Sequence, residues 1–120
     1  MIPLLMLAAA VVAVDGNTLE IDGESMVLWG ASTPNPSSAI GRQARLYLSV
    51  LASEGPLSCA LKLPDPPLWQ CRTAAGSDIA SLLVQTGLAY AAGPYYQHEQ
   101  SLARAAGTGL WRQNRDSTPP

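Results

Sequence analysis

The stretch VVAVDGNTLEIDGESMVLW, residues 11–29, decides the fold of this chain. It is rich in β-branched and aliphatic side chains, which favour strands, and turn-forming residues interrupt it twice. The first interruption is Asp15-Gly16-Asn17, and the second is Asp22-Gly23, a pair typical of two-residue hairpins. We therefore expect strands over 11–21 and over Met26–Trp29 that form a β-meander.

Beyond a loop at residues 32–38, the sequence predicts a helix over residues 38–53, which Gly55-Pro56 ends. Apolar side chains recur there at three- and four-residue steps, as on one face of a helix. They are Ile40, Ala44, Tyr47, Leu48 and Leu51. Strands are expected at 57–63 and 68–73. The run Pro64-Asp65-Pro66-Pro67 between them predicts a stiff loop, because proline cannot donate to a strand ladder.

Two more helices are expected toward the C-terminus. The first is capped by Ser77, carries Asp78 in its first turn and ends at Gly87; its buried side is Ile79, Leu82 and Leu83. The last covers residues 95–106.

The order strands, helix, two strands, helix, helix predicts an α+β protein. A five-stranded OB-fold β-barrel with three α-helices fits this order. We expect one domain over residues 1–113 and a flexible tail over 114–120.

The composition bears on the class of ligand. Of the 120 residues, 48% are apolar and 13% are charged, with a formal net charge of −2, and the seven Lys and Arg residues are scattered. Nucleic-acid binders normally carry a basic stripe, because phosphate neutralisation supplies most of their affinity. The composition therefore argues against a general nucleic-acid role, although it leaves room for a small basic pocket.

The first 13 residues contain no charged side chain, and two interpretations stay open. A secretory signal would use this apolar run and Ala8-Ala9-Ala10, but the usual basic start is missing. A strand leading into Val11–Val14 is the interpretation we favour. The segment is too short to cross a bilayer, so we expect no membrane span.

Two cysteines, Cys59 and Cys71, have eleven residues between them. If the flanking strands pair as a hairpin, a disulfide can form, and it would stabilise the fold by about 2–3 kcal/mol in the chain-entropy model. A bridge would indicate a periplasmic or secreted protein. Two reduced, buried cysteines in a cytoplasmic protein are the alternative. No Cys/His cluster has zinc-ligand spacing, so no metal site is predicted.

Residues 14–19, VDGNTL, differ at one position from the pattern V-D-G-D-T-L, and residues 27–35 line up with R-L-x-G-I-D-x-P-E. The pattern G-L-A, Y…E and G-L-W is followed at residues 87–89, Tyr95, Glu99 and residues 109–111. In this order, the pieces resemble the staphylococcal nuclease (thermonuclease-like) family over about residues 11 to 112. The resemblance implies the same OB-fold with three helices.

In active members of that family, carboxylates hold a calcium ion, a glutamate helps to activate water, and two arginines neutralise charge on the phosphate. A hard cation requires oxygen ligands, and charge that builds up on a phosphate requires fixed cations. Only a peripheral carboxylate, Asp15, is kept here. The degenerate positions are Asn17 and Ser32 for calcium aspartates, Val27 for an arginine, Asn35 for the glutamate, and Pro66 in a shortened loop without the second arginine. We therefore expect calcium to be lost and no catalytic residue to remain.

Four other residues are candidate groove contacts. Tyr95 and Tyr96 could stack against bases or sugars, and Arg42 and Arg45, on the outer side of the first helix, could bind a phosphate or an acidic partner. A half-buried tyrosine pair and a solvated helix face are the alternatives. His98 and Glu99 are adjacent on a helix and so do not face each other; we expect a surface or packing role for His98 and a helix-fixing hydrogen bond for Glu99.

The sequence thus predicts a catalytically inactive nuclease-like domain that serves as a binding or interaction module, with a protein or glycan favoured over nucleic acid as the partner. Some bacterial relatives carry exopolysaccharide (succinoglycan) biosynthesis labels, which the resemblance permits. The alternative is a divalent-metal-dependent phosphodiesterase with a rebuilt site that uses Asp15 and Asp65.

Overall fold

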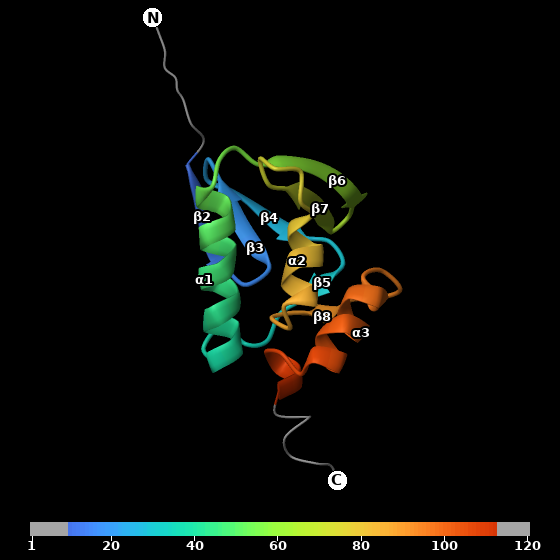
Figure 1. Ribbon diagram of the computed structural model, residues 1–120. Helices are drawn as coiled ribbons and strands as arrows, with labels where there is room; N and C mark the ends of the chain where they lie inside the picture. The colour runs from blue at the N-terminus through green and yellow to red at the C-terminus, as the bar shows by residue number, and fades with distance from the viewer. Residues whose placement is uncertain (1–9, 113–120) are drawn as a thin grey trace, which may run out of the picture.

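A computed structural model describes residues 10–112 of the chain (Figure 1). The predictions for residues 1–9, within the uncharged N-terminal segment, and for the tail at 114–120 lie outside the described residues. The elements are β2 (Val11–Asp15), β3 (Thr18–Ile21), β4 (Glu24–Leu28), β5 (Ala31–Ser32), α1 (Ala39–Ser53), β6 (Ser58–Pro64), β7 (Pro67–Arg72), α2 (Ile79–Gln85), β8 (Tyr90–Ala91) and α3 (Gln97–Ala106).

The N-terminal meander is formed as the sequence predicts. β2 pairs with β3 and β3 pairs with β4, both antiparallel. Asp22 and Gly23 connect β3 to β4 with φ angles of 53° and 82°. Positive φ at both central residues is what a type I′ hairpin turn needs, and this turn matches the twist of the flanking strands.

These strands belong to a five-stranded mixed sheet with the order β2-β3-β4-β7-β6. β4 and β7 run parallel, with Val27 opposite Leu68 and Leu28 opposite Trp69, and the other pairs are antiparallel. Within residues 10–112 the edge strands β2 and β6 do not pair with each other, so the described sheet is open. The fold is therefore α+β. A small second sheet, β5 with β8, was not predicted.

The proline run is a tight hairpin and not the four-residue loop that the sequence suggested. Pro64 and Pro67 stand opposite each other at the ends of β6 and β7, and only Asp65 and Pro66 form the turn. The missing N–H groups are tolerated there because β6 is an edge strand and the prolines sit at the strand ends.

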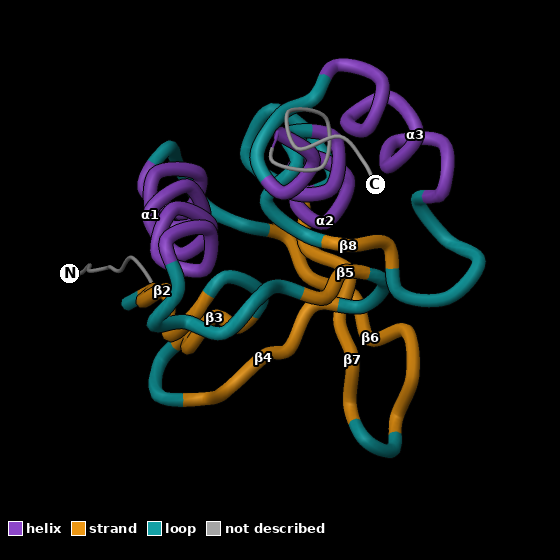
Figure 2. Tube along the Cα trace, turned by 90° about the horizontal axis from the view of Figure 1, so that it is seen from below, coloured by secondary structure: helices purple, strands orange, loops and turns teal. Residues whose placement is uncertain are grey.

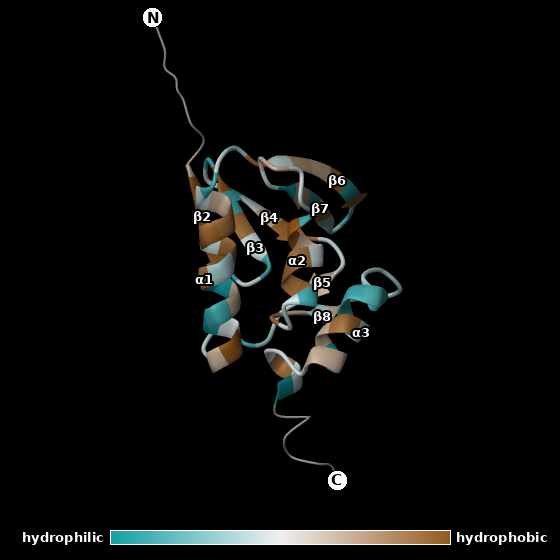
Figure 3. Cartoon of the chain, viewed as in Figure 1, coloured by the Kyte–Doolittle hydropathy of each residue, from teal (hydrophilic) through white to brown (hydrophobic). Residues whose placement is uncertain are grey.

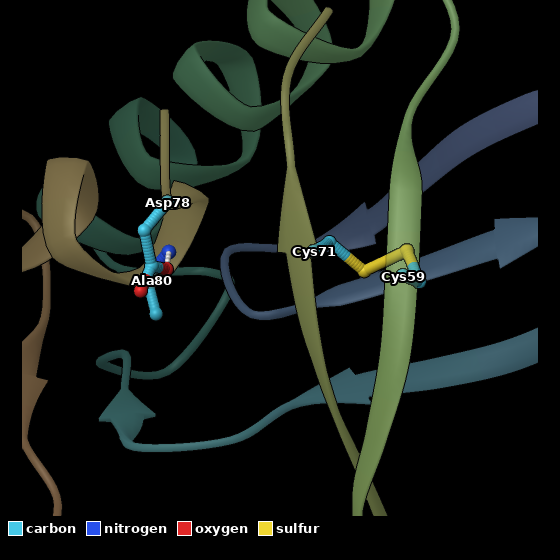
Figure 4. Close-up of a disulfide and its surroundings, with 4 residues drawn as sticks. All are labelled: Cys59, Cys71, Asp78 and Ala80. Atoms are coloured by element: carbon cyan, nitrogen blue, oxygen red, sulfur yellow. Dashed lines mark hydrogen bonds between the residues drawn. A yellow bond between two sulfur atoms is a disulfide. The ribbon is translucent and has the colours of Figure 1, made fainter. Parts of the chain in front are cut away.

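The predicted disulfide is present between the same two strands. Cys59 and Cys71 are direct partners across the β6–β7 ladder, and their sulfurs are bonded at 2.07 Å (Figure 4). Cys71 is fully buried against the core, whereas Cys59 is partly exposed.

α1 follows its prediction closely. Ser38 caps it, because the Ser38 hydroxyl accepts a hydrogen bond from the N–H of Gly41. Ala44, Leu48 and Leu51 are buried, and each large aliphatic side chain removed from water contributes about 1.5–3 kcal/mol.

α2 begins one residue later than predicted, because its cap is Asp78 and not Ser77. Oδ1 of Asp78 accepts hydrogen bonds from the N–H groups of Ala80 and Ser81. Figure 4 shows the contact between Asp78 and Ala80. Leu82 is only half-buried. The buried side of α2 consists of Ile79, Ala80, Leu83 and Val84.

α3 begins two residues later than predicted. Tyr96, the residue before it, has a left-handed backbone conformation with φ 62°, so Tyr95 and Tyr96 belong to the preceding turn. Residues 110–112 form a further helical turn, one helical segment more than the sequence suggested.

The helices α1 and α2 lie on the same side of the five-stranded sheet, and α2 stands between α1 and α3 (Figures 1 and 2). The core fills the space between this sheet and the two helices. Figure 3 shows the corresponding contrast in hydropathy, with α2 mostly hydrophobic and the first turn of α3 hydrophilic. No helix in the described part of the chain has the length and apolar character required to cross a membrane.

Candidate functional site

Asp15 and Asn17, which the resemblance would place at a calcium site, lie at the turn between β2 and β3. Oδ1 of Asp15 accepts a 3.0 Å hydrogen bond from the N–H of Asn17. The Asn17 amide nitrogen donates to the carbonyl of Ala31 at 3.3 Å, and its Oδ1 accepts from the Thr18 hydroxyl at 3.2 Å. Both side chains therefore hold the turn and fasten it to β5.

The next two positions also lie in local structure. Ser32 is exposed in β5 and stands opposite Tyr90 of β8. Oδ1 of Asn35 accepts hydrogen bonds from the N–H and the hydroxyl of Ser37, at 2.8 and 2.7 Å. The Asn35 carbonyl accepts from Ser38, which caps α1. Asn35 thus builds the turn that starts the helix, a usual use of Asn.

The two arginine positions hold uncharged side chains. Val27 is half-buried in β4, between Thr18 of β3 and Leu68 of β7. Pro66 is exposed in the β6–β7 turn. Neither side chain can offer a cation to a phosphate.

This donor set does not fit a calcium ion. Calcium takes six to eight oxygen ligands, several of them carboxylates, and Asp15 is the single carboxylate among these positions. One of its oxygens is already used within the turn. Across residues 10–112, no three His, Cys, Asp or Glu side chains are grouped so that they could hold a metal ion.

Three aromatic rings and one lysine come together around Trp29, and we call them the aromatic face: Trp29, Lys62, Tyr95 and Tyr96. The rings of Trp29 and Tyr95 have centroids 4.1 Å apart and are tilted by 45°. Tyr96 meets Trp29 edge-on at 5.9 Å, and the Lys62 ammonium stands 4.9 Å from the Trp29 ring centre. Tyr95 is 47% exposed, so one ring of the cluster is open to a ligand.

Tyr96 joins the aromatic face to the start of α2. Its hydroxyl donates a 2.7 Å hydrogen bond to Oδ2 of Asp78, and the Gln70 amide donates to the same oxygen at 2.9 Å. Its ring lies against the backbone of Gly30, where an added Cβ would come within 2.4 Å of Cε2. Burial, and then the hydrogen bond to Asp78, raise the pKa of Tyr96, so its phenol keeps the proton that it donates to Asp78.

A second polar contact joins α2 to α3. The Ser81 hydroxyl donates a 2.9 Å hydrogen bond to Oε2 of Glu99, which accounts for Glu99 as a residue that fixes α3. His98 is exposed on α3 and points to no catalytic partner in the described part of the chain. These contacts are structural.

The predicted groove contacts are not brought together. Tyr95 and Tyr96 stand before α3, whereas Arg42 and Arg45 are exposed on α1, on the far side of α2 (Figure 2). One nitrogen of Arg42 donates to the carbonyl of Ser37 and so supports the start of α1.

An apolar pocket with a volume of about 520 Å³ lies at the other end of α1. Its lining carries no ionisable side chain, so it offers no chemistry of its own. It is formed by Val11, Ile21, Ala52, Ser53, Gly55, Pro56 and Leu57.

Sequence reasoning missed the two residues that shape the aromatic face from other elements. Lys62 lies on β6, and its contact with Trp29 depends on how β6 and β7 pack beside β4. Asp78 was expected only as a charge in the first turn of α2. An Asp that precedes a helix, with a tyrosine predicted nearby, is a signal for capping but not for the Tyr96 contact.

Comparison with models of known protein families, and with curated protein sequences, finds no match to this chain.

Proposed function

We propose that this chain is a nuclease-like OB-fold domain without nuclease activity, and that it works as a binding module through the aromatic face. The observation that carries the proposal is the open Tyr95 ring, which packs at a tilt against Trp29.

The sheet supports the scaffold assignment. The last strand of the sheet, β7, lies between β4 and β6, as in a Greek-key order, and it pairs in parallel with β4. Along the chain, α1 connects the β2–β4 meander to the β6–β7 hairpin. A partly open five-stranded barrel of the OB type needs this kind of order. The motif pieces that suggested the resemblance lie at the β2–β3 turn, residues 14–19, and from β4 through β5 into the following loop, residues 27–35.

The contacts of the family-site residues support the loss of catalysis. Asp15, Asn17 and Asn35 use their side-chain oxygens as acceptors within turns. Loss of one preorganised charge donor costs roughly 10²- to 10³-fold in rate, and here the base and both cations are replaced. No contact of the described residues favours a metal site rebuilt from Asp15 and Asp65.

The class of partner follows from charge. A protein or a glycan suits a chain of net charge −2 better than a nucleic acid does, because polyanions need several cations. The Cys59–Cys71 bridge fits a periplasmic or secreted location. A role in exopolysaccharide biosynthesis, of the succinoglycan kind, is compatible with a glycan ligand.

The catalytic part is tested by incubating the protein with single-stranded DNA and RNA in calcium, beside an active nuclease of the family. We expect no cleavage at high protein concentration. Calcium-dependent cleavage that persists through repurification and disappears in Asp15→Ala would overturn this part.

The binding part is tested with an array of oligosaccharides and peptides, probed with the wild type and with Tyr95→Ala. We expect at least one class of ligand to bind the wild type and to lose affinity for Tyr95→Ala. If no ligand shows a dependence on Tyr95, the aromatic face is not a binding surface.

A further inference from the structure

We propose that the aromatic face recognises an acidic glycan, with the Tyr95 ring stacked on a pyranose and the Lys62 ammonium paired with a carboxylate on that sugar. The inference rests on the proposed binding function and names its ligand.

The proposed stacking contact is inferred from the exposure of the Tyr95 ring. Tyr95 is 47% exposed although its neighbours Trp29 and Tyr96 are half-buried. An aromatic face carries a partial negative charge, and the C–H groups on one side of a pyranose carry partial positive charge, so the two attract each other. Trp29 supports Tyr95 from behind at 4.1 Å, and this support reduces the ring freedom that a ligand would otherwise have to freeze.

The proposed contact with a carboxylate is inferred from the position of Lys62. Its ammonium stands 4.9 Å from the Trp29 ring centre, and this cation–π contact holds it beside the stack. Among residues 10–112 no carboxylate forms an ion pair with it. An ammonium without an ion-pair partner has N–H donors available for an anion, and a carboxylate accepts a short, charge-assisted hydrogen bond from them.

The elements hold the two groups at one place. Trp29 follows β4, Lys62 lies on β6, and Tyr95 lies in the turn before α3. Tyr95 and Lys62 both contact the Trp29 ring. The Tyr95 ring centre and the Lys62 ammonium lie 4.1 and 4.9 Å from the centre of that ring, so the span between them suits a monosaccharide together with its carboxylate.

A nucleic acid fits this face less well. A single-stranded nucleic acid would stack a base on Tyr95, but it also needs cations along its phosphates. Lys62 is the cation that contacts the aromatic cluster, whereas Arg42 and Arg45 lie across the molecule on α1. A single carboxylate next to a sugar ring matches a single ammonium next to a phenol ring.

The test uses a trisaccharide of galactose that carries one terminal galacturonate, which we call the acidic trisaccharide, and calorimetric titration of the disulfide-intact protein. Its methyl ester keeps the rings and removes the charge. Polyglutamate keeps the carboxylates and removes the rings, and single-stranded oligothymidylate offers bases with phosphates. We expect the acidic trisaccharide to bind about tenfold more tightly than each of the other three, because a charge-assisted contact and a stacking contact are both made.

Variants separate the two contacts. Lys62→Gln should lower the affinity for the acidic trisaccharide by about tenfold and leave the affinity for the methyl ester unchanged, and Lys62→Arg should restore binding. Tyr95→Ala should weaken binding of both sugars, whereas Tyr95→Phe should not. Arg45→Gln removes a cation from the other side of the molecule and should have no effect.

Three results would overturn the proposal. Equal affinity for the acid and its ester would show that Lys62 does not read a carboxylate, and equal affinity for polyglutamate would show that the sugar ring is not read. Tighter binding of oligothymidylate would make the ligand a nucleic acid. If the acidic trisaccharide fails to bind while another ligand binds in a Tyr95-dependent way, the acidic glycan is wrong and the binding module stands.

Discussion

The Tyr96 hydroxyl donates a 2.7 Å hydrogen bond to Oδ2 of Asp78, whose other carboxylate oxygen caps α2. One carboxylate thus ties the turn that carries Tyr95 to the start of a core helix. Because Tyr95 stands next to Tyr96, the orientation of the exposed ring depends on this part-buried bond.

Removal of the phenol should weaken the fold in a pH-dependent way. Tyr96→Phe keeps the ring and loses the hydrogen bond, so we expect a loss of about 1 kcal/mol in the free energy of unfolding near neutral pH. Burial and the hydrogen bond to Asp78 raise the pKa of Tyr96 above that of an unfolded tyrosine, about 10. Its contribution is therefore complete below about pH 10 and is lost as the pH rises through the higher folded-state pKa.

Urea unfolding of the wild type and of Tyr96→Phe, from about pH 8 to about pH 11, checks this sign. The wild type should lose stability more steeply above about pH 10 than the variant. Tyr47, whose pKa is raised by burial and by Glu54, is present in both proteins and cancels in the comparison. Parallel curves would mean that Tyr96 ionises as easily in the folded chain as in the unfolded one.

Substitutions at Asp78 should separate its two roles. Asp78→Ala removes the cap and the acceptor for Tyr96 and Gln70, and we expect a loss of about 2–3 kcal/mol. Asp78→Ser keeps a capping hydroxyl, so about half of that loss should remain. Ser77→Ala is the control, because the Ser77 backbone, and not its side chain, makes the hydrogen bonds with Thr73. If Ser77→Ala were as damaging as Asp78→Ala in urea unfolding, the cap would be misassigned.

Gly30 should resist substitution because of Tyr96. Its φ is +86°, and a Cβ would lie 2.4 Å from the Tyr96 ring, so Gly30→Ala should cost about 2–4 kcal/mol. Gly23 has nearly the same φ, +82°, with nothing within 4 Å of a Cβ. Gly23→Ala should therefore show the backbone strain alone, about 1 kcal/mol. Equal losses in thermal unfolding would show that the ring moves aside freely.

The disulfide should contribute about 3 kcal/mol, since it closes a loop with a sequence separation of 12. The double variant Cys59→Ala/Cys71→Ala and the reduced wild type should lose similar stability in urea. Intact-mass measurement after denaturing alkylation should find both thiols protected until reductant is added. Free thiols in protein produced in an oxidising compartment would contradict the bridge.

The elements fixed by local chemistry were predictable from the sequence. The Asp22-Gly23 turn needs two positive φ angles, which this pair supplies, and the apolar spacing of Ala44, Leu48 and Leu51 leaves one face for α1 to bury. Pairing of β6 with β7 across Cys59 and Cys71 likewise follows from two strands joined by a short link.

Features set by contacts distant in sequence were not predictable. Ser77 and Asp78 are both good caps, and the choice between them is consistent with the bonds of Asp78 to Tyr96 and Gln70. Tyr95 and Tyr96 fit a helical pattern, but Tyr96 takes a left-handed backbone where its ring meets Gly30. In the candidate site, the residue types at the positions of the resemblance could be read directly from the sequence. The partnership of Lys62 with Trp29 required the packing of two hairpins.

The covalent bond across the β6–β7 hairpin also decides what happens when the backbone is cut there. Asp65 and Pro66 form an exposed tip inside the loop that Cys59 and Cys71 close. A protease that severs the chain at this tip would add one water to the mass without separating two fragments. The nicked molecule would still carry Lys62 on its strand, and only reduction would release the two pieces.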